Sequence, residues 1–147
     1  MKPPKDSLEF IKLLNANTVK YIVVGGYAVA WHGYPRFTGD IDFFVECSPA
    51  NATALAKTVE QFGFASLGLT TKDFMEPGVV IQLGRPPYRI DILTFADGLT
   101  FAQAWQSKVK GEWEGVPVNM ISKPDLVTNK LASGRDQDRV DASKLAN

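Results

Sequence analysis

The feature that most constrains this chain is a glycine pair, Gly25-Gly26, followed after thirteen intervening residues by the acidic motif Asp40-Ile41-Asp42-Phe43. The glycines end the apolar, β-branched run 21–24, which predicts a buried strand, and the alanine-rich segment 27–32 predicts a helix. Side chains alternate between the two faces of a strand, so both carboxylates of the acidic motif are expected on one face. A strand, a glycine turn, a helix and an acidic strand thus follow one another within a short stretch.

The rest of the sequence predicts an α+β fold with a short mixed sheet. Helices are expected from a cap at Asp6 or Ser7 to residues 15–17, over 50–62, 101–105 and 122–133, and from Asp136 onward, with strands over 40–46, 79–83, 89–94, 108–113 and 116–120. The last four strands are expected to form two hairpins. We expect residues 1–147 to form one domain, with a core over about 20–120 and C-terminal helices over about 122–146. The helices are expected on one side of the sheet and the acidic residues at one edge.

Composition excludes several classes of protein. Lysine and arginine total 16, as do aspartate and glutamate, so the chain lacks the bulk positive charge of a non-specific nucleic-acid binder. No apolar run approaches the roughly 20 residues needed to span a bilayer, and residues 1–5 lack the apolar stretch of a signal peptide. The single cysteine, Cys47, cannot form an internal disulfide, which is typical of a reducing compartment. We therefore expect a soluble, cytoplasmic protein.

The acidic motif predicts a metal site. Two carboxylates a few ångströms apart repel, and burial would raise the pKa of at least one unless a cation neutralises them. Mg²⁺ prefers hard oxygen ligands of this kind, and Mn²⁺ accepts the same donors. Asp91, inside the apolar run 89–93, joins Asp40 and Asp42 if the two strands are neighbours. Three such carboxylates can hold two ions, one activating an attacking hydroxyl and the other stabilising the leaving oxygen.

The glycine pair is the complementary feature. Gly25 and Gly26 carry no Cβ atom, so their backbone can approach a phosphate closely, and the amides that begin the following helix point outward as donors. Taken alone, the glycines could equally form an ordinary tight turn, and the acidic pair a solvated strand face. Their order and spacing, with a later carboxylate, favour a nucleotide phosphate held between amides and metal ions.

Together these residues resemble the nucleotidyltransferases of the DNA polymerase beta superfamily. The signature of that superfamily is Gly-[Gly/Ser], about nine to thirteen residues, an Asp-h-[Asp/Glu]-h motif in which h is apolar, and a third carboxylate on a later strand. The longer runs 25–33 and 36–42 are most similar to the branch that contains AbiEii-type toxins and small uncharacterised relatives. The segment 130–141 also resembles the C-terminal pattern of that branch. The resemblance spans about residues 20–145 and implies the nucleotidyltransferase fold.

The resemblance also implies a role for each matched residue. Asp40 and Asp42 would bind the metal ions, and Asp91 would bridge them or act as the base that activates the acceptor hydroxyl. Gly25 and Gly26 would hold the triphosphate. Glycine stands here where many relatives have a serine, so a hydroxyl contact to phosphate is missing.

Basic residues are further candidates, because two Mg²⁺ ions do not cancel the whole charge of a triphosphate. Arg36 lies four residues before Asp40 and is expected either to contact phosphate or to form an ion pair with one of the aspartates. Lys130 is expected to reach the phosphates from its helix, with a solvated helix face as the alternative. A salt-bridge lock between the last two helices is expected from Arg135, Asp138, Arg139 and Asp141.

The sequence thus predicts an Mg²⁺-dependent nucleotidyltransferase that moves a nucleoside monophosphate from a triphosphate to an acceptor hydroxyl and releases pyrophosphate. The acceptor stays open among an RNA 3′ end, a small molecule and a protein side chain. It is expected to be bound by the C-terminal helices, by the second subunit of a homodimer or by a cognate partner protein. The alternative is a non-catalytic nucleotide-binding or partner-binding module, such as the antitoxin-like component of a toxin–antitoxin system. Three carboxylates favour the enzyme, because unpaired buried carboxylates are costly where they have no function.

Overall fold

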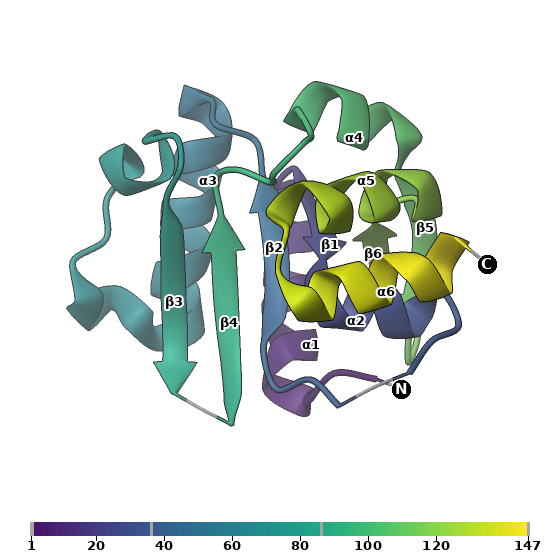
Figure 1. Ribbon diagram of the computed structural model, residues 1–147. Helices are drawn as coiled ribbons and strands as arrows, with labels where there is room; N and C mark the ends of the chain where they lie inside the picture. Colours follow the sequence, from purple (N-terminus) through teal and green to yellow (C-terminus); the bar gives the residue numbers. More distant parts are fainter. Residues whose placement is uncertain (1, 36, 86, 147) are drawn as a thin grey trace.

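The computed structural model describes residues 2–35, 37–85 and 87–146 and shows an α+β fold built on a six-stranded mixed sheet (Figure 1). The strands lie in the order β3-β4-β2-β1-β6-β5. Their bounds are Tyr21–Val24 (β1), Ile41–Val45 (β2), Val80–Arg85 (β3), Tyr88–Leu93 (β4), Val109–Trp113 (β5) and Val116–Met120 (β6). The pairs β2/β4 and β1/β6 are parallel, and the other three neighbouring pairs are antiparallel. Both predicted hairpins, β3/β4 and β5/β6, are confirmed.

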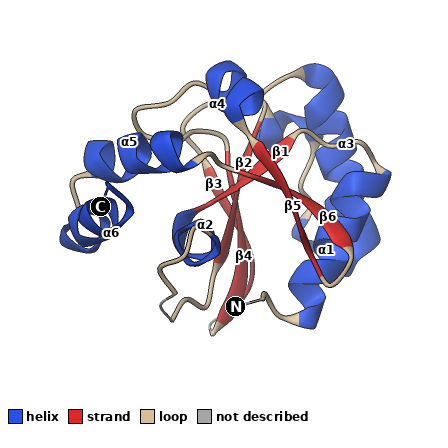
Figure 2. Cartoon of the chain, turned by 90° about the vertical axis from the view of Figure 1, so that its right-hand side faces the viewer, coloured by secondary structure: helices blue, strands red, loops and turns tan. Residues whose placement is uncertain are grey.

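Helices cover both faces of the sheet, which corrects the expectation of helices on one side (Figure 2). The α-helices are α1 (Lys5–Ala16), α2 (Gly25–Trp31), α3 (Pro49–Val59), α4 (Phe101–Ser107), α5 (Lys123–Ser133) and α6 (Asp136–Ala146). Three short helical turns, Glu60–Phe64, Ala65–Leu67 and Thr71–Phe74, follow α3. Helices α1 and α3 pack on one face, and α2, α5 and α6 lie on the other. The physical reason is that every residue of β1 is buried, so both faces of the central strand need a cover.

The sheet face toward α1 and α3 is packed with aromatic side chains. Phe43 of β2 contacts Phe10 of α1 and Tyr21 of β1, with ring centroids 5.6 and 5.7 Å apart. Because residues on a strand alternate, the neighbours Asp42 and Phe44 project to the opposite face, which α2, α5 and α6 cover. None of the described helices is both long and apolar enough to cross a membrane.

Caps fix where the helices begin. The side chains of Ser48, Thr100 and Ser122 accept hydrogen bonds from backbone amides at the starts of α3, α4 and α5. Helix α2 differs, because it begins at Gly25 directly after β1, two residues earlier than expected, and its cap Val24 offers no side-chain acceptor. The sole histidine, His32, ends α2 and places Nε2 2.8 Å from the Ile121 carbonyl oxygen. The strand β1 therefore leads into α2 without a loop.

Candidate active site

Strand register places two of the predicted carboxylates side by side. The strands β2 and β4 are parallel neighbours, and Asp42 is the direct partner of Asp91. The same row continues to Gln82 on β3 and to Val24 on β1. Asp40 lies just before β2. Because β2 and β4 are interior strands in the six-stranded order, the acidic side chains lie within the sheet and not on an edge strand.

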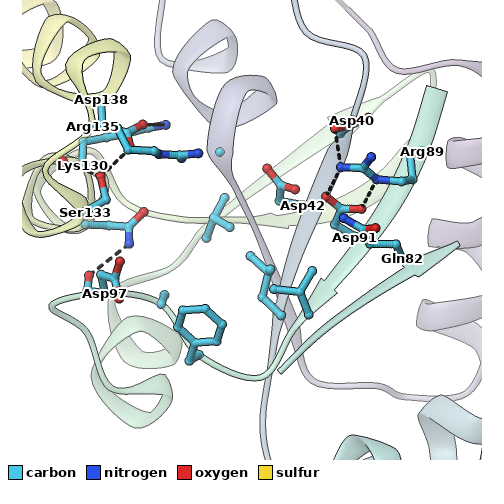
Figure 3. A pocket seen from close by; sticks show the side chains of 17 residues that line it. Asp40, Asp42, Gln82, Arg89, Asp91, Asp97, Lys130, Ser133, Arg135 and Asp138 are labelled. Atoms are coloured by element: carbon cyan, nitrogen blue, oxygen red, sulfur yellow. Dashed lines mark hydrogen bonds and ion pairs between the residues drawn. The ribbon is translucent and has the colours of Figure 1, made fainter. Parts of the chain in front are cut away.

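This row lines a cavity of about 470 Å³ on the sheet face that α5 and α6 cover (Figure 3). Of the predicted site residues in the described part of the chain, the cavity brings together Gly25, Asp40, Asp42, Asp91 and Lys130, but not Gly26. The remaining predicted residue, Arg36, lies outside the described residues. The glycine turn, the acidic strand and the later carboxylate thus meet at one place.

Packing requires glycine at both positions of the pair. Gly25 has φ +72°, and a Cβ atom built on it would lie 2.1 Å from Asp42 Oδ2. A Cβ atom at Gly26 would lie 2.8 Å from the Oγ1 atom of Thr38. The Thr38 side chain therefore already fills this space. Gly25 therefore makes room for the Asp42 carboxylate, and its contact with a phosphate stays a prediction.

Arg89 is a site residue that the sequence analysis missed. Its Nε donates to Asp91 Oδ1 at 2.7 Å, and its Nη2 donates to Asp40 Oδ2 at 2.8 Å (Figure 3). The hydrogen bond to Asp91 raises the pKa of Arg89 above its already high value, so the guanidinium stays charged. A signal for it existed, because Arg89 lies two residues before Asp91 on the same strand and hence on the same face. Arg89 makes the ion pair that was one of the two expectations for Arg36.

Among the described residues, no cation forms an ion pair with the Asp42 carboxyl. Burial, with the charges of Asp91 and Asp40 and a hydrogen bond with Asp91, raises the pKa of Asp42 to about 7. The Asp42 carboxyl thus holds a proton at and below about neutral pH. This is the response expected of a buried carboxylate beside other carboxylates.

The donor set suits a hard divalent cation, although the side chains are not gathered around one point. Among the described residues, no group of three or more His, Cys, Asp or Glu side chains is placed to hold a metal ion. Asp42 and Asp91 are adjacent, whereas Asp40 is turned to Arg89. Carboxylate oxygens are the ligands that Mg²⁺ prefers. To gather all three carboxylates, an ion has to displace the Arg89 guanidinium from Asp40.

Lys130 is buried, with 4% of its surface exposed, so the expectation of a solvated helix face is wrong. Its Nζ lies 2.9 Å from Asp138 Oδ1 and 3.5 Å from Asp141 Oδ2. The ammonium is therefore directed at two buried carboxylates of α6, although the residue borders the cavity. Ion pairs thus join α5 to α6, as predicted for the last two helices, but only in part through the predicted residues. Asp138 and Asp141 take part, whereas the cation between the helices is Lys130 and not Arg139.

Arg135 is the accessible cation on this side of the cavity. Its side chain is 78% exposed, and its Nε donates to Asp138 Oδ2 at 2.6 Å. Burial alone would raise the pKa of Asp138, but hydrogen bonds from Ser133, Lys130 and Arg135 lower it to about 2. The hydrogen bond to Asp138 raises the pKa of Arg135. A permanently charged guanidinium is thus anchored at one nitrogen and lines the cavity that also contains Asp42 (Figure 3).

The cavity also has apolar lining. Val80, Leu93, Phe95 and Ala96 contribute to it, and Val80 and Phe95 are 44% and 37% exposed. Nearby, the Asn129 side chain donates to the Asp97 carbonyl oxygen at 3.0 Å. Apolar surface next to charged groups is typical of pockets for small organic ligands.

Carboxylates on adjacent strands, opposite an anchored arginine, define a class of site suited to a polyphosphate and its metal ion. The model of the family described as nucleotidyltransferase of unknown function (DUF6036) matches residues 6–146, so the chain belongs to this family. The match includes the glycine turn, all three carboxylates and both C-terminal helices. It supports nucleotidyl transfer in general, and its description does not extend to AbiEii-type toxins. No curated protein matches the chain.

Proposed function

We propose that this protein is an Mg²⁺-dependent nucleotidyltransferase that moves a nucleoside monophosphate from a nucleoside triphosphate to an acceptor hydroxyl. The observation that carries the proposal is the in-register pair Asp42 and Asp91, in one cavity with the anchored cation Arg135. The pair provides oxygen ligands and the arginine provides the charge that a triphosphate needs. The family match supports the same general chemistry.

Each part of the cavity has a role in this proposal. The β- and γ-phosphates lie at Arg135, which replaces the predicted Lys130 because the Lys130 ammonium is already paired with buried carboxylates. The α-phosphate lies near Asp42 and next to the backbone of Gly25. The base packs on the apolar lining that includes Phe95. The cation at Arg135 stabilises the charge that develops on the departing pyrophosphate.

Asp40, Asp42 and Asp91 would hold Mg²⁺, or Mn²⁺ in its place, which when bound neutralises charge on the α-phosphate and on the leaving oxygen. The acceptor oxygen forms a bond to the α-phosphorus, and the bond from that phosphorus to the bridging α–β oxygen breaks. Pyrophosphate leaves with the electron pair, and the Asp91 carboxylate takes the hydroxyl proton. Arg89 moves from Asp40 to let that side chain turn toward the phosphate.

The biological setting follows from the resemblance to the AbiEii-type branch. We propose that a second copy of the chain or a cognate partner protein completes acceptor binding, as in a toxin–antitoxin pair. The acceptor is an RNA 3′ end, a small molecule or a protein side chain.

One observation favours the alternative, a nucleotide-binding module without catalysis. Arg89 already neutralises Asp40 and Asp91, so a nucleotide could bind at Arg135 with no metal ion present. The two functions differ in one product, because only the enzyme releases pyrophosphate.

The test combines transfer and pyrophosphate release. The protein is incubated with α-labelled nucleoside triphosphates, Mg²⁺ and separate pools of RNA, small molecules and cell proteins. We expect label in one pool, with an equal amount of pyrophosphate, and loss of both in the isosteric variants Asp42→Asn and Asp91→Asn. Nucleotide binding without transfer to any pool and without pyrophosphate would refute the enzyme and support the binding module.

A further inference from the structure

A second hollow adjoins the candidate active site. It is a groove of about 520 Å³ lined by Lys2, Pro3, Pro4, Lys5, Leu8, Tyr27, Phe37, Thr38, Tyr88 and Glu114, and we refer to it as the N-terminal groove. Segments far apart in the sequence meet there, because the chain before α1, the residues before β2 and the start of β4 lie together. None of the roles proposed above uses these residues.

The N-terminal groove meets the active site at Asp40. The Thr38 hydroxyl donates to the Asp40 carbonyl oxygen at 3.3 Å, and Tyr88 directly precedes Arg89, which holds the Asp40 carboxylate. Tyr27 of α2 also lines the groove, and the charge of Asp40 is among the causes that raise its pKa, after burial and Tyr88. The groove and the carboxylates are therefore neighbours at Asp40.

The surface of the groove combines exposed aromatic rings with ammonium groups. Phe37 is 80% exposed and Tyr88 is 58% exposed, the first and third highest values among the exposed large hydrophobic residues of the described chain. Lys2 lies in the chain before α1 and Lys5 is the first residue of α1. The one acidic side chain of the described lining, Glu114, is paired with Lys2. Aromatic faces next to cations suit bases and their phosphates, because bases stack on rings and phosphates attract ammonium groups. These lining residues offer no unpaired carboxylate that could bind a polycationic small molecule, so the groove favours an anionic acceptor.

The position of the groove matches the direction that the chemistry requires. In phosphoryl transfer the attacking and leaving oxygens lie roughly in line on opposite sides of the phosphorus. Figure 3 shows Arg135 on one side of Asp42, and Asp40 with Arg89 on the other. If pyrophosphate is held at Arg135, the acceptor has to approach from the side of Asp40 and Arg89. The groove residues Thr38 and Tyr88 are the near sequence neighbours of these two residues.

We infer that the N-terminal groove binds the 3′-terminal nucleotides of a single-stranded nucleic acid and presents the terminal hydroxyl to the carboxylates. This inference rests on the proposed function and selects one acceptor class from those left open. Phe37 and Tyr88 stack on the last bases, and Lys5 contacts a backbone phosphate. The balanced net charge of the chain is compatible with this inference, since a few terminal nucleotides need only a local contact with positive charge.

The experiment measures binding of short labelled oligonucleotides to the full chain. Fluorescence anisotropy with a fluorescein-labelled single-stranded RNA is compared with DNA of the same sequence, with a circular RNA that has no 3′ end, and with a blunt duplex. The variants are Phe37→Ala, Tyr88→Ala and Lys5→Ala, and Leu67→Ala is the control because Leu67 is 51% exposed and lies outside the groove. Affinity for a non-hydrolysable nucleoside triphosphate is measured on the same samples.

We expect the linear single strand to bind. Each ring substitution should weaken binding about 5- to 150-fold, the range for loss of one base–aromatic stack. Lys5→Ala should reduce the salt dependence by about one phosphate contact. Leu67→Ala and the triphosphate affinities should stay unchanged. Wild-type protein that binds no single strand, binds circular RNA equally well, or is insensitive to both ring substitutions would overturn the inference. A wild type that binds RNA through these rings but binds no triphosphate would instead contradict the proposed function.

Discussion

Replacing Asp42 with asparagine is expected to stabilise the metal-free protein while abolishing transfer. Burial and the neighbouring carboxylates raise the pKa of Asp42 from 3.8 to about 7. A tenfold change in an ionisation constant corresponds to about 1.4 kcal/mol, so charging this side chain in the folded state costs at most about 4 kcal/mol. Because Asp42 keeps part of its surface in contact with solvent, we expect a gain of about 1–2 kcal/mol at about pH 8.

The gain depends on pH in a defined direction. The folded protein holds the Asp42 proton up to about pH 7, whereas the unfolded chain releases it near 3.8. The stability that the protonated carboxyl confers is therefore fully present below pH 3.8 and is lost as the pH rises through about 7. Asparagine does not titrate, so the free energy of unfolding of the variant should exceed that of the wild type by more at about pH 8 than at about pH 5.

Urea denaturation at these two pH values, in the presence of a chelator, measures the difference. Glu76→Gln is the control, because it removes an exposed carboxylate and should change neither the stability nor its pH dependence. Addition of millimolar Mg²⁺ should stabilise the wild type more than the variant, since the ion neutralises the same charge. An Asp42→Asn variant that is less stable than the wild type at about pH 8, or a gap that does not grow with pH, would refute this account of the site.

Three further substitutions test separate parts of the site. Gly25→Ala should abolish pyrophosphate release and lower the free energy of unfolding by more than about 2 kcal/mol, because the new Cβ atom displaces the Asp42 carboxylate. Gly68→Ala, with a similar φ of +66° but open space around it, should lower the free energy of unfolding by only about 1 kcal/mol, and equal losses in urea denaturation would contradict this reasoning. Arg135→Ala should weaken nucleoside triphosphate binding at least about tenfold in calorimetry and should weaken monophosphate binding less, whereas Arg139→Ala, at an exposed position four residues later in α6, should change neither. Equal losses for both nucleotides would argue against a contact with the β- and γ-phosphates. Arg89→Gln should tighten Mg²⁺ binding, because a guanidinium no longer competes for the Asp40 and Asp91 carboxylates, and should lower the melting temperature of the metal-free protein. Weaker Mg²⁺ binding would show instead that Arg89 holds these carboxylates in place for the ion.

The elements of the fold could be predicted from the sequence, whereas their arrangement could not. Local signals mark the hairpins and helix caps, such as the turn residues after β3 and Ser122 before α5. The order of the strands depends on pairing between distant segments, and nothing near β2 specifies β4 as its parallel neighbour. One feature of the arrangement could have been predicted from local sequence. The run of four apolar residues in β1 indicates burial on both faces, and hence helices on both sides of the sheet.

The same distinction applies to the candidate site. The carboxylates were visible as charges inside apolar strands, and Arg89 could have been found from its spacing to Asp91. The burial of Lys130 also had a signal, because it lies four residues after the buried Leu126 and hence on the same face of α5. The sequence does not predict how α5 and α6 pack against each other. That packing decides whether the Lys130 ammonium reaches the cavity or the neighbouring helix.

The contact between α5 and α6 also fixes the position of Arg135 beside the cavity. A buried ammonium requires partners, and Lys130 has them in Asp138 and Asp141. Arg135 adds a second cation at Asp138 through Nε. Because the pKa of Asp138 is lowered to about 2, its carboxylate stays charged at neutral pH and keeps this anchor. The guanidinium is thus held in place before a ligand arrives, and a fixed cation stabilises developing charge without the cost of reorganisation. If the proposed nucleotide site is correct, the ion pairs between α5 and α6 support it, and loosening them should weaken nucleotide binding even where no contact to the nucleotide is removed.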